Sequence, residues 1–524
     1  MKKHVLLLLC SFAAFSFAAC EKTDNPPDEK TDNPPETPFL TVSPDTDILF
    51  PSGGGRRDIV VATNQTTWDA VSDREWCAIE KDGDKLTISA GENEKVNPKP
   101  DATVSITAGT LTRTITVGQE GILIPVMSLD HDGTSNCYIV TYASWYSFDA
   151  TVIGNGAAGI IDPSAFHTGN PAITPVSAKL LWQDYYENGQ GLITAVELYR
   201  NNVLFSTARP LIAGNALIAV CDANDNILWS WHIWIPSVAV APLPSATGYE
   251  VMNLNLGALT DEPANPKSYG MLYQWGRKDP LPAAATLLGN ISTVGAPIYD
   301  AEGQPVSISN SSWSDVTSNT LLYAIRNPTV CLSNNAQYAS SRDWLKADLS
   351  SDALWGNPQG NIKDQYNQYV NKGMKSCYDP CPPGWRVPPA DVFRNFTPSG
   401  GYEQADANDD VPFNVIDINS DDILNLADYN YGWRFYLDKD NAIASYFPAA
   451  ARFDGQYAML MGSMSGLWGA YWGNAPYTLT NAAGGGFSVL SFQTHNYNGT
   501  KTISASPAAG ASRADAYSVR CIKD

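Results

Sequence analysis

The sequence has 524 residues and a formal net charge of −21 at pH 7, although only 17% of its residues are charged. A surface this acidic repels nucleic acid and anionic lipid headgroups, which excludes both as expected partners. The low charged fraction, 40 glycines and 11% aromatic residues suit an exported protein of strands and loops better than a helical intracellular enzyme. The length allows about two to four domains.

The N-terminus has the pattern of an export signal. Two lysines near the start are followed by an apolar run over 5–18, and Ala19 precedes Cys20. That run is shorter than the about 20 residues that a membrane-spanning helix needs. The pattern resembles a bacterial lipoprotein signal, which implies removal of the signal peptide 1–19 and lipidation of Cys20. An ordinary cleaved signal peptide is the alternative.

Residues 20–38 are predicted to form a solvated tether. The sequence Glu-Lys-Thr-Asp-Asn-Pro-Pro occurs over 21–27 and again over 29–35, and its prolines favour an extended spacer with nothing apolar to bury. Acidic residues just after the cysteine resemble the surface-export signal of Bacteroidota-type lipoproteins. The resemblance implies an outer-membrane lipoprotein exposed on the cell surface, with periplasmic retention as the alternative.

Residues 39–121 predict a small all-β domain. Apolar and polar residues alternate over 58–62, 85–89, 103–107 and 112–119, with hairpin-turn sequences at Asp82-Gly83 and Ala108-Gly109. Trp68, Trp76 and the closing segment 116–121 resemble the BACON domain, which implies an immunoglobulin-like β-sandwich that serves in carbohydrate binding or as a spacer. Both tryptophans are candidates for stacking on sugar rings, but in a small sandwich we expect them in the core.

Residues 122–247 predict a second β-rich, sandwich-like domain. Strand patterns cover 136–140, 178–182, 196–200, 203–205, 214–220 and 227–234, with turns at Asn201-Asn202 and over Asp222–Asn226. The last run, Leu-Trp-Ser-Trp-His-Ile-Trp, is bulky on both faces, which is typical of a strand between two layers. We therefore expect His232 to be a hydrogen-bonded structural residue rather than a base or a ligand.

Residues 248–524 form the largest predicted unit. Its marked segments are Asn253–Ala258, Gly270–Pro280, Tyr378–Pro388 and Tyr517–Cys521. Together they resemble the Fibrobacter succinogenes major paralogous domain, found near the C-termini of some fimbrillin-family, pilus-tip-like proteins. The resemblance implies an α+β, C-type-lectin-like fold related to formylglycine-generating enzymes, with a twisted sheet and long loops. The whole chain is thus predicted to be mainly β and multidomain.

Seven cysteines remain after the signal peptide and Cys20 are set aside. Their spacing gives no pair of C-x-x-C motifs, so a structural zinc site is not expected. The C-terminal resemblance implies a disulfide between Cys381 and Cys521. The pairing of the others stays open: Cys77, Cys137, Cys221, Cys331 and Cys377. For Cys377 an incidental thiol is favoured over a copper–thiolate site of the formylglycine-generating kind.

One acidic segment has the spacing of a metal-binding loop. Over 417–428, side chains with oxygen atoms fall at positions 1, 3, 5, 9 and 12: Asp417, Asn419, Asp421, Asn425 and Asp428. The spacing resembles an EF-hand or dockerin calcium loop, and Ca²⁺ takes about six to eight oxygen ligands. Asp422 stands where such loops carry glycine, so a solvated acidic loop is the alternative.

No catalytic motif stands out in the sequence. The mature chain holds four histidines, none near a nucleophile motif, and it has no G-x-S-x-G, H-E-x-x-H or P-loop sequence. The prediction is therefore a protein that is not an enzyme. A glycosidase carboxylate pair stays open, because its signature is a spatial separation that the sequence does not show.

The resemblances together imply an adhesin-like or pilus-tip-like surface lipoprotein, associated with a fimbrium, that binds glycan or a pilin-type protein partner. Trp468, Tyr471 and Trp472 are the candidate sugar-stacking residues, with burial in the core as the alternative. The runner-up function is an accessory lipoprotein or glycoside hydrolase of a polysaccharide-utilisation system. A structural pilus subunit is the third.

Overall fold

The structure is a computed structural model of the chain. It describes residues 37–95, 97–122, 125–158, 171–290, 292–311, 320–333, 343–345, 353–356, 373–406, 410–477, 486–497 and 500–524. The predicted signal peptide, Cys20 and all but the end of the tether lie outside these residues. The chain divides into two compact units, 1–123 and 124–524. In the part that the structure describes, no helix has both the length and the apolar character to cross a membrane.

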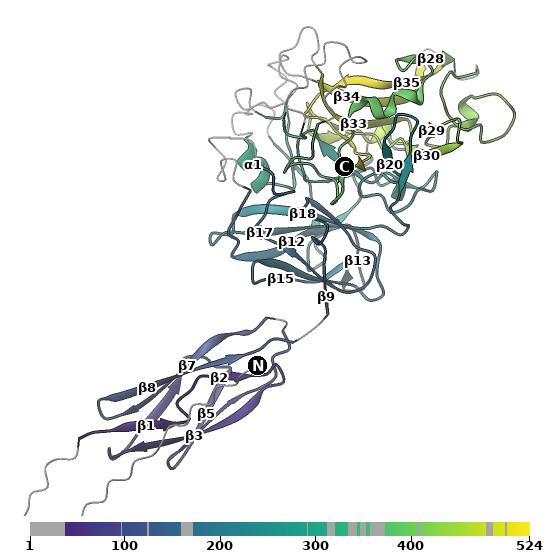
Figure 1. The fold of residues 1–524 in the computed structure, drawn as a ribbon. Helices are drawn as coiled ribbons and strands as arrows, with labels where there is room; N and C mark the ends of the chain where they lie inside the picture. The colour runs from purple at the N-terminus through teal and green to yellow at the C-terminus, as the bar shows by residue number, and fades with distance from the viewer. Residues whose placement is uncertain are drawn as a thin grey trace, which may run out of the picture. The chain divides into compact units, whose positions relative to one another are not determined.

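The first unit is a β-sandwich (Figure 1). Its strands are β1 (Leu40–Ser43), β2 (Ile48–Phe50), β3 (Gly55–Thr63), β4 (Asp69–Ser72), β5 (Cys77–Asp82), β6 (Lys85–Ala90), β7 (Lys99–Ala108) and β8 (Leu111–Gln119). One sheet has the order β1-β3-β6-β5 and the other β2-β8-β7-β4. The strands pair antiparallel, except that β2 runs parallel to β8.

Alternating side chains build the core between these two sheets. Ile88 of β6 and Ile106 of β7 are fully buried in one cluster. The residues that follow them, Ser89 and Thr107, point away from this core and are partly or fully exposed. The hairpin turns fall where the sequence predicts them, because Gly83 and Gly109 have the positive φ angles of 60° and 61° that glycine accepts. Trp68 lies in the core, as expected.

The second unit begins with two facing sheets. Its first strands are β9 (Val126–Ser128), β10 (Cys137–Ile139), β11 (Trp145–Asp149), β12 (Ser177–Gln183), β13 (Tyr186–Glu187), β14 (Gln190–Gly191), β15 (Ile193–Tyr199), β16 (Asn202–Thr207), β17 (Gly214–Cys221) and β18 (Ile227–Ile235). A six-stranded sheet has the order β10-β18-β17-β12-β23-β24, and a four-stranded sheet has the order β15-β16-β11-β9. The β15–β16 hairpin turns through Arg200 and Asn201, both with positive φ.

The rest of the second unit combines short strands with one larger sheet. Its elements are β19 (Pro242–Pro244), β20 (Glu250–Met252), η1 (Pro266–Ser268), β21 (Met271–Gln274), β22 (Leu281–Pro282), β23 (Ile298–Tyr299), β24 (Pro305–Val306), β25 (Ser309–Asn310), α1 (Leu321–Arg326), β26 (Val330–Cys331), β27 (Trp385–Arg386), η4 (Ala390–Phe396), β28 (Glu403–Asp406), η5 (Leu426–Asp428), β29 (Gly432–Asp438), β30 (Ile443–Pro448), β31 (Phe453–Asp454), β32 (Met459–Leu460), η6 (Gly462–Met464), β33 (Trp468–Tyr477), β34 (Gly486–Tyr497), β35 (Thr500–Ala511), β36 (Ala516–Ser518) and β37 (Ile522–Lys523). The main path of the largest sheet is β22-β21-β36-β33-β34-β35-β28.

Strand β18 lies between two layers, as its sequence predicts. The ring of Trp231 contacts that of Phe148 in β11 at a centroid distance of 5.1 Å. The neighbouring His232 side chain points to the other face and contacts Tyr273 in β21. The six-stranded sheet is therefore a central layer, covered by the four-stranded sheet on one side and by the C-terminal part of the unit on the other.

The boundary predicted between residues 247 and 248 falls inside this second unit. One hydrophobic cluster runs from Cys137 to Cys521 and includes Trp231, Tyr273 and Trp472. At this point the two predicted domains share one core, because both parts bury their side chains against the same central sheet. The mainly β, multidomain fold class is confirmed.

Candidate functional site

The three aromatic residues predicted to stack on sugars belong to strand β33. Tyr471 and Trp472 are fully buried, and Trp468 is half-buried. The Tyr471 hydroxyl donates to the Pro448 carbonyl at 2.7 Å, and the Trp472 indole N–H donates to the Tyr273 carbonyl at 2.6 Å. These rings are therefore anchored in the core.

The position of β33 explains this burial. It is an inner strand of the large sheet, between β36 and β34, and its neighbours Tyr471 and Trp472, which point to opposite faces, are each buried in a different hydrophobic cluster. The Trp468 ring, nearer the surface, has the Arg452 guanidinium 4.6 Å from its centroid and meets the Tyr517 ring in a T-shaped contact. Burial in the core, the alternative to a sugar-stacking role, is thus what the structure shows for Tyr471 and Trp472, and the Arg452 guanidinium covers one face of half-buried Trp468.

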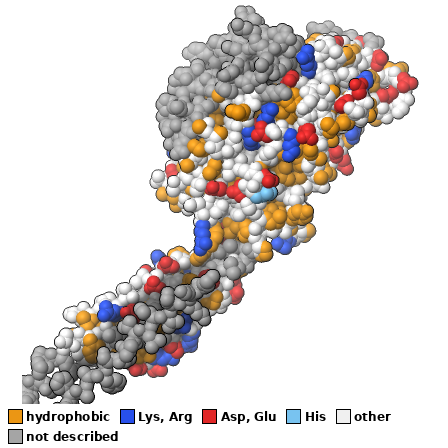
Figure 2. Space-filling model, viewed as in Figure 1, with side chains coloured by type: hydrophobic (Ala, Val, Ile, Leu, Met, Phe, Trp, Pro, Cys, Tyr) orange, Lys and Arg blue, Asp and Glu red, His pale blue; other side chains and the backbone are white. Residues whose placement is uncertain are grey.

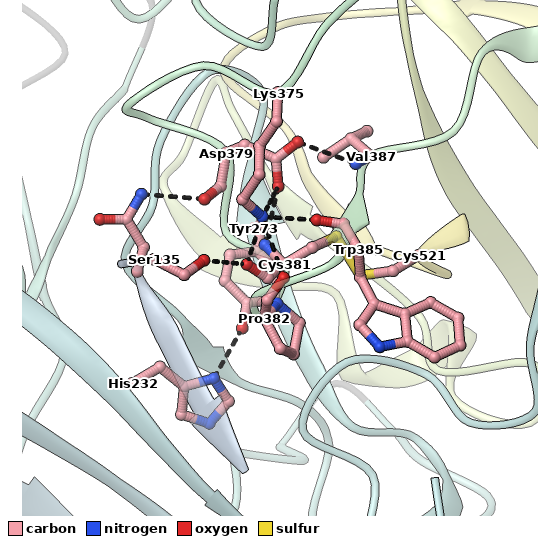
Figure 3. The surroundings of a disulfide bond; sticks show 11 residues. Ser135, His232, Tyr273, Lys375, Asp379, Cys381, Pro382, Trp385, Val387 and Cys521 are labelled. Carbon is pink, nitrogen blue, oxygen red and sulfur yellow. Dashed lines mark hydrogen bonds and ion pairs between the residues drawn. A yellow bond between two sulfur atoms is a disulfide. The ribbon is translucent and has the colours of Figure 1, made fainter. Parts of the chain in front are cut away.

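The predicted disulfide between Cys381 and Cys521 is confirmed, with an S–S distance of 2.08 Å. Figure 3 shows the Lys375 ammonium directed at the backbone beside it, where it donates to the carbonyls of Cys381, Pro382 and Trp385 at 2.5–3.1 Å. The Asp379 carboxylate accepts from the backbone N–H groups of Cys381 and Val387. Buried polar groups that satisfy one another in this way hold a loop in shape.

The remaining thiols are also structural. Cys77, Cys137, Cys221, Cys331 and Cys377 are all buried and unpaired. Burial raises the pKa of Cys331 and of Cys377 to about 12, so both stay protonated at neutral pH. A protonated thiol is a poor nucleophile and a poor metal ligand, which agrees with the interpretation of Cys377 as an incidental thiol.

The acidic segment 417–428 folds into a loop in which carboxylates accept hydrogen bonds from backbone N–H groups. The Asp417 carboxylate accepts two of them, at 2.7 and 2.8 Å, and buried Asp428 accepts two more, at 2.8 and 3.0 Å. Asn425 and Asp428 form the capping box of η5. Asp422 has a φ of 63°, the left-handed conformation that glycine has in metal-binding loops.

This geometry leaves calcium binding a prediction. Within the described part of the chain, no group of three or more His, Cys, Asp or Glu side chains is placed to hold a metal ion. The ligand set predicted for calcium, Asp417, Asn419, Asp421, Asn425 and Asp428, serves here in hydrogen bonds within the loop.

A surface cavity of about 250 Å³ lies where the six-stranded sheet meets the C-terminal part of the unit. We call it the Asp184 pocket. Its lining residues are Asp184, Tyr185, Ala213, Asn215, Gly257, Leu259, Pro266, Lys267, Gly270, Met271, Ala283, Ala284, Ala285 and Ala296. Many of these residues are glycine or alanine, whose small side chains let a ligand approach the backbone closely. Asp184 and Lys267 contribute its charged groups.

Asp184 directly follows β12, and Asn215 of the neighbouring strand β17 holds its side chain. The backbone N–H of Asn215 donates to Asp184 Oδ1 at 2.7 Å, and Asn215 Nδ2 donates to Asp184 Oδ2 at 2.8 Å. Burial raises the pKa of Asp184 to about 6, despite these hydrogen bonds. At neutral pH the pocket therefore contains a carboxylate ion fixed in one orientation.

His232 stands directly behind Asn215. Its Nε2 lies 2.9 Å from Asn215 Oδ1, and its Nδ1 lies 3.1 Å from the hydroxyl of Tyr273. Burial lowers the pKa of His232 to about 3, so the ring is neutral at physiological pH. The expected structural role of this histidine agrees with these contacts, since both ring nitrogens are engaged inside the core.

A second cavity, of about 530 Å³, adjoins the first and shares Ala296 with it. Apolar and hydroxyl side chains line it, including Pro282, Val294, Val306 and Phe453, and it presents no charged group among its described lining residues. Its Val294 side chain is 70% exposed. This cleft has no fixed charge with which to orient a polar ligand, which makes the Asp184 pocket the stronger candidate site.

The sequence interpretation missed the Asp184 pocket. Asp184 is one carboxylate among many, and its partners lie 31 residues away at Asn215 and 83 residues away at Lys267 by their positions in the chain. The one local signal is the run Gln-Asp-Tyr-Tyr at the end of a predicted strand, where polar and aromatic residues follow an apolar stretch. Such a strand end is a common location for binding residues.

No family model and no curated protein matches this chain. Among solved structures, it is similar to the NMR structure of a protein from Bacteroides thetaiotaomicron, at 14% identity and a TM-score of 0.15, over 18% of this chain and 95% of that chain. A titin tandem of immunoglobulin domains matches at 10% identity and a TM-score of 0.17, over 37% and 96% of the two chains. Domains 4–9 of the surface-layer protein SbsC match at 13% identity and a TM-score of 0.14, over 52% and 39%. These scores carry no argument about function.

Proposed function

We propose that this protein is a surface-exposed outer-membrane lipoprotein that binds glycan in an adhesin-like or pilus-tip-like role, without turning the glycan over. The observation that carries the proposal is the Asp184 pocket. Sugars are recognised by planar polar side chains that take up hydroxyl hydrogens and by rings that cover their C–H faces. Asp184 supplies the first of these and the half-buried Tyr185 beside it supplies the second.

The size of the pocket supports binding of a single sugar ring. Sites for drug-sized ligands measure about 300–1,000 Å³, so a cavity of about 250 Å³ takes one compact ring rather than a chain. Figure 2 shows acidic and basic side chains interspersed on the viewed face of the second unit, an arrangement that does not favour a highly charged ligand.

The composition of the pocket supports binding over hydrolysis. Most glycoside hydrolases place a pair of carboxyl groups about 5–9.5 Å apart across the scissile bond. Asp184 is the single carboxylate among the described residues that line this pocket. The glycoside hydrolase alternative therefore has less support here than retention of an intact glycan.

The location follows from the N-terminal sequence. Cys20 carries the lipid in this proposal, and the proline-rich tether holds both units away from the outer membrane. A lipid anchor at one end and a binding pocket in the second unit suit a protein that attaches the cell to a surface.

The test is to apply the purified full-length protein to a glycan array and to a panel of soluble polysaccharides. We expect it to retain a defined set of glycans while the amount of reducing ends in solution stays constant. Release of reducing ends would establish the hydrolase alternative. Retention of no glycan, together with co-purification of pilin subunits from cells, would establish the structural pilus role instead.

A further inference from the structure

A hydrogen-bonded chain of four side chains runs from the core to the wall of the Asp184 pocket. It consists of Tyr273, His232, Asn215 and Asp184, and consecutive members are 2.8–3.1 Å apart. The first three are buried. They come from β21, β18 and β17, so the chain crosses from the C-terminal part of the unit through the central sheet.

The direction of every hydrogen bond in this chain is determined by Asn215. Its Nδ2 hydrogens go to Asp184 Oδ2 and to the Gly257 carbonyl, at 2.8 and 3.0 Å, because both of those oxygens can only accept. Its Oδ1 must then accept from His232 Nε2–H. With its proton on Nε2, the neutral histidine accepts the Tyr273 hydroxyl hydrogen at Nδ1.

This order keeps the Asp184 carboxylate an acceptor. Each of its oxygens takes one hydrogen from Asn215, and the backbone N–H of Asp184 also interacts with the group; a carboxylate oxygen has two acceptor positions, so each oxygen has capacity to accept from a ligand. A ligand that satisfies both must bring two hydrogens at the spacing of the two oxygens. Two neighbouring hydroxyl groups on a sugar ring meet this requirement, whereas a carboxylate or phosphate offers only acceptors.

We propose that the Asp184 pocket recognises the terminal residue of a neutral glycan through a pair of neighbouring hydroxyl groups, with Asn215, His232 and Tyr273 as positioning residues. The inference rests on the proposed glycan-binding function and names its ligand class. The terminal residue is favoured because the cavity of about 250 Å³ has room for one ring. Acidic sugars are disfavoured because Asp184 is half-buried, while the opposite charge, on Lys267, is exposed and screened by water.

The test measures binding of methyl glycosides to the full-length protein by ligand-observed NMR. The panel pairs methyl α-galactopyranoside, methyl α-glucopyranoside and methyl α-mannopyranoside with their single-deoxy analogues and with the matching uronic acids. We expect at least one neutral glycoside to bind, and its deoxy analogue at one of the two recognised positions to bind about tenfold or more weakly, since a hydrogen bond to a charged group is lost.

Two variants separate recognition from folding. Asp184→Asn replaces one acceptor oxygen with a donor and should weaken binding about tenfold to a hundredfold. Asp225→Asn, in the exposed turn between β17 and β18, is the matched control and should leave affinity unchanged. Tyr273→Phe removes the last donor of the chain and should weaken binding several-fold. In the wild-type protein, ¹⁵N NMR should show His232 with its proton on Nε2.

The outcomes distinguish this inference from the proposed function. If the wild-type protein retains glycans on the array but Asp184→Asn binds them equally well, the pocket assignment is wrong and the glycan-binding function stands. Stronger binding of the uronic acids, or a His232 proton on Nδ1, would also overturn the inference. If the wild-type protein retains no glycan at all, the proposed function itself fails.

Discussion

At the scale of single residues, Asp184 and His232 respond to pH in opposite directions. Burial lowers the pKa of His232 from 6.5 to about 3 and raises the pKa of Asp184 from 3.8 to about 6. Between about pH 4 and pH 6, unfolding lets the histidine take up a proton and makes the aspartic acid release one. The histidine therefore makes the fold more stable as pH rises, the aspartic acid makes it less stable, and the two effects nearly cancel.

Replacing either Asp184 or His232 should reveal the pH dependence of stability that the other residue causes. We expect the free energy of unfolding of Asp184→Asn to rise with pH more steeply than that of the wild type, by up to about 1.4 kcal/mol per pH unit between pH 4 and 6. His232→Gln should change the slope in the opposite direction. Urea unfolding at several pH values measures both slopes, and equal slopes for the three proteins would contradict the opposed titrations.

Single residues also show where prediction from the sequence reaches its limit. His232 was predicted to be structural, because bulky neighbours on both sides of its strand indicate burial from local sequence alone. Trp472 has equally aromatic neighbours, yet whether such a residue lies in a core or on a loop depends on which strands flank it. The pairing of β33 with β34 and β36 is a long-range property that no local pattern contains.

At the scale of elements, the disulfide joins the segment before β27 to the segment before β37. The two cysteines are 140 residues apart in the chain. Closing a loop of this length restricts the unfolded chain and stabilises the fold by up to about 5 kcal/mol on entropic grounds. We expect the free energy of unfolding of the double variant Cys381→Ala/Cys521→Ala, measured in urea, to be a few kcal/mol lower than that of the wild type.

The matched control for the disulfide is Cys221→Ala, which removes a buried thiol without opening a cross-link. Under reducing conditions the wild type should approach the stability of the double variant, while Cys221→Ala should keep the same difference from wild type with and without reductant. A double variant as stable as the wild type would show that packing, and not the cross-link, holds these strands together.

The loop 417–428 carries the calcium prediction at this scale. The predicted ligands include three of the four carboxylates of this short loop, those of Asp417, Asp421 and Asp428, so a bound Ca²⁺ would offset their repulsion and stabilise the folded state. We expect millimolar Ca²⁺ to raise the melting temperature above its value in chelator, and Asp421→Asn to abolish most of that rise. Asp222→Asn, in the β17–β18 turn, is the control. A melting temperature that is the same with and without the ion would refute the prediction.

The elements themselves were well predicted from the sequence where alternation is strong. The patterns over 85–89, 214–220 and 227–234 fall within β6, β17 and β18. The C-terminal strands were harder, because many are only two or three residues long, too short for a period of two to stand out. The Asp184 pocket could not be predicted from the sequence for a related reason, since its walls come from segments that meet only in the folded unit.

At the scale of the whole molecule, the shared core changes which fragments should fold. Residues 125–247 and 248–524 bury their side chains in one cluster, so cutting between them would expose Trp231 and Tyr273 together. We expect a fragment of residues 248–524 to be insoluble or to lack a cooperative thermal transition. A fragment of residues 125–524 should unfold cooperatively, and a fragment of residues 37–122 should do so independently. Calorimetry of the three fragments measures this, and a cooperative transition in residues 248–524 would restore the boundary predicted from the sequence.

Strand β9 would be a mechanical weak point in the proposed lipid-anchored protein. The chain enters the second unit at Val126–Ser128, and this strand pairs with β11 over three residues at the edge of a sheet. Its side chains are exposed, so it adds little to the core. If the protein is held at its N-terminus by the proposed lipid and at the Asp184 pocket by the proposed ligand, tension along the chain acts directly on these few hydrogen bonds. Separation of β9 from β11 would lengthen the linker between the two units and take up a sudden load, while the Asp184 pocket kept its shape.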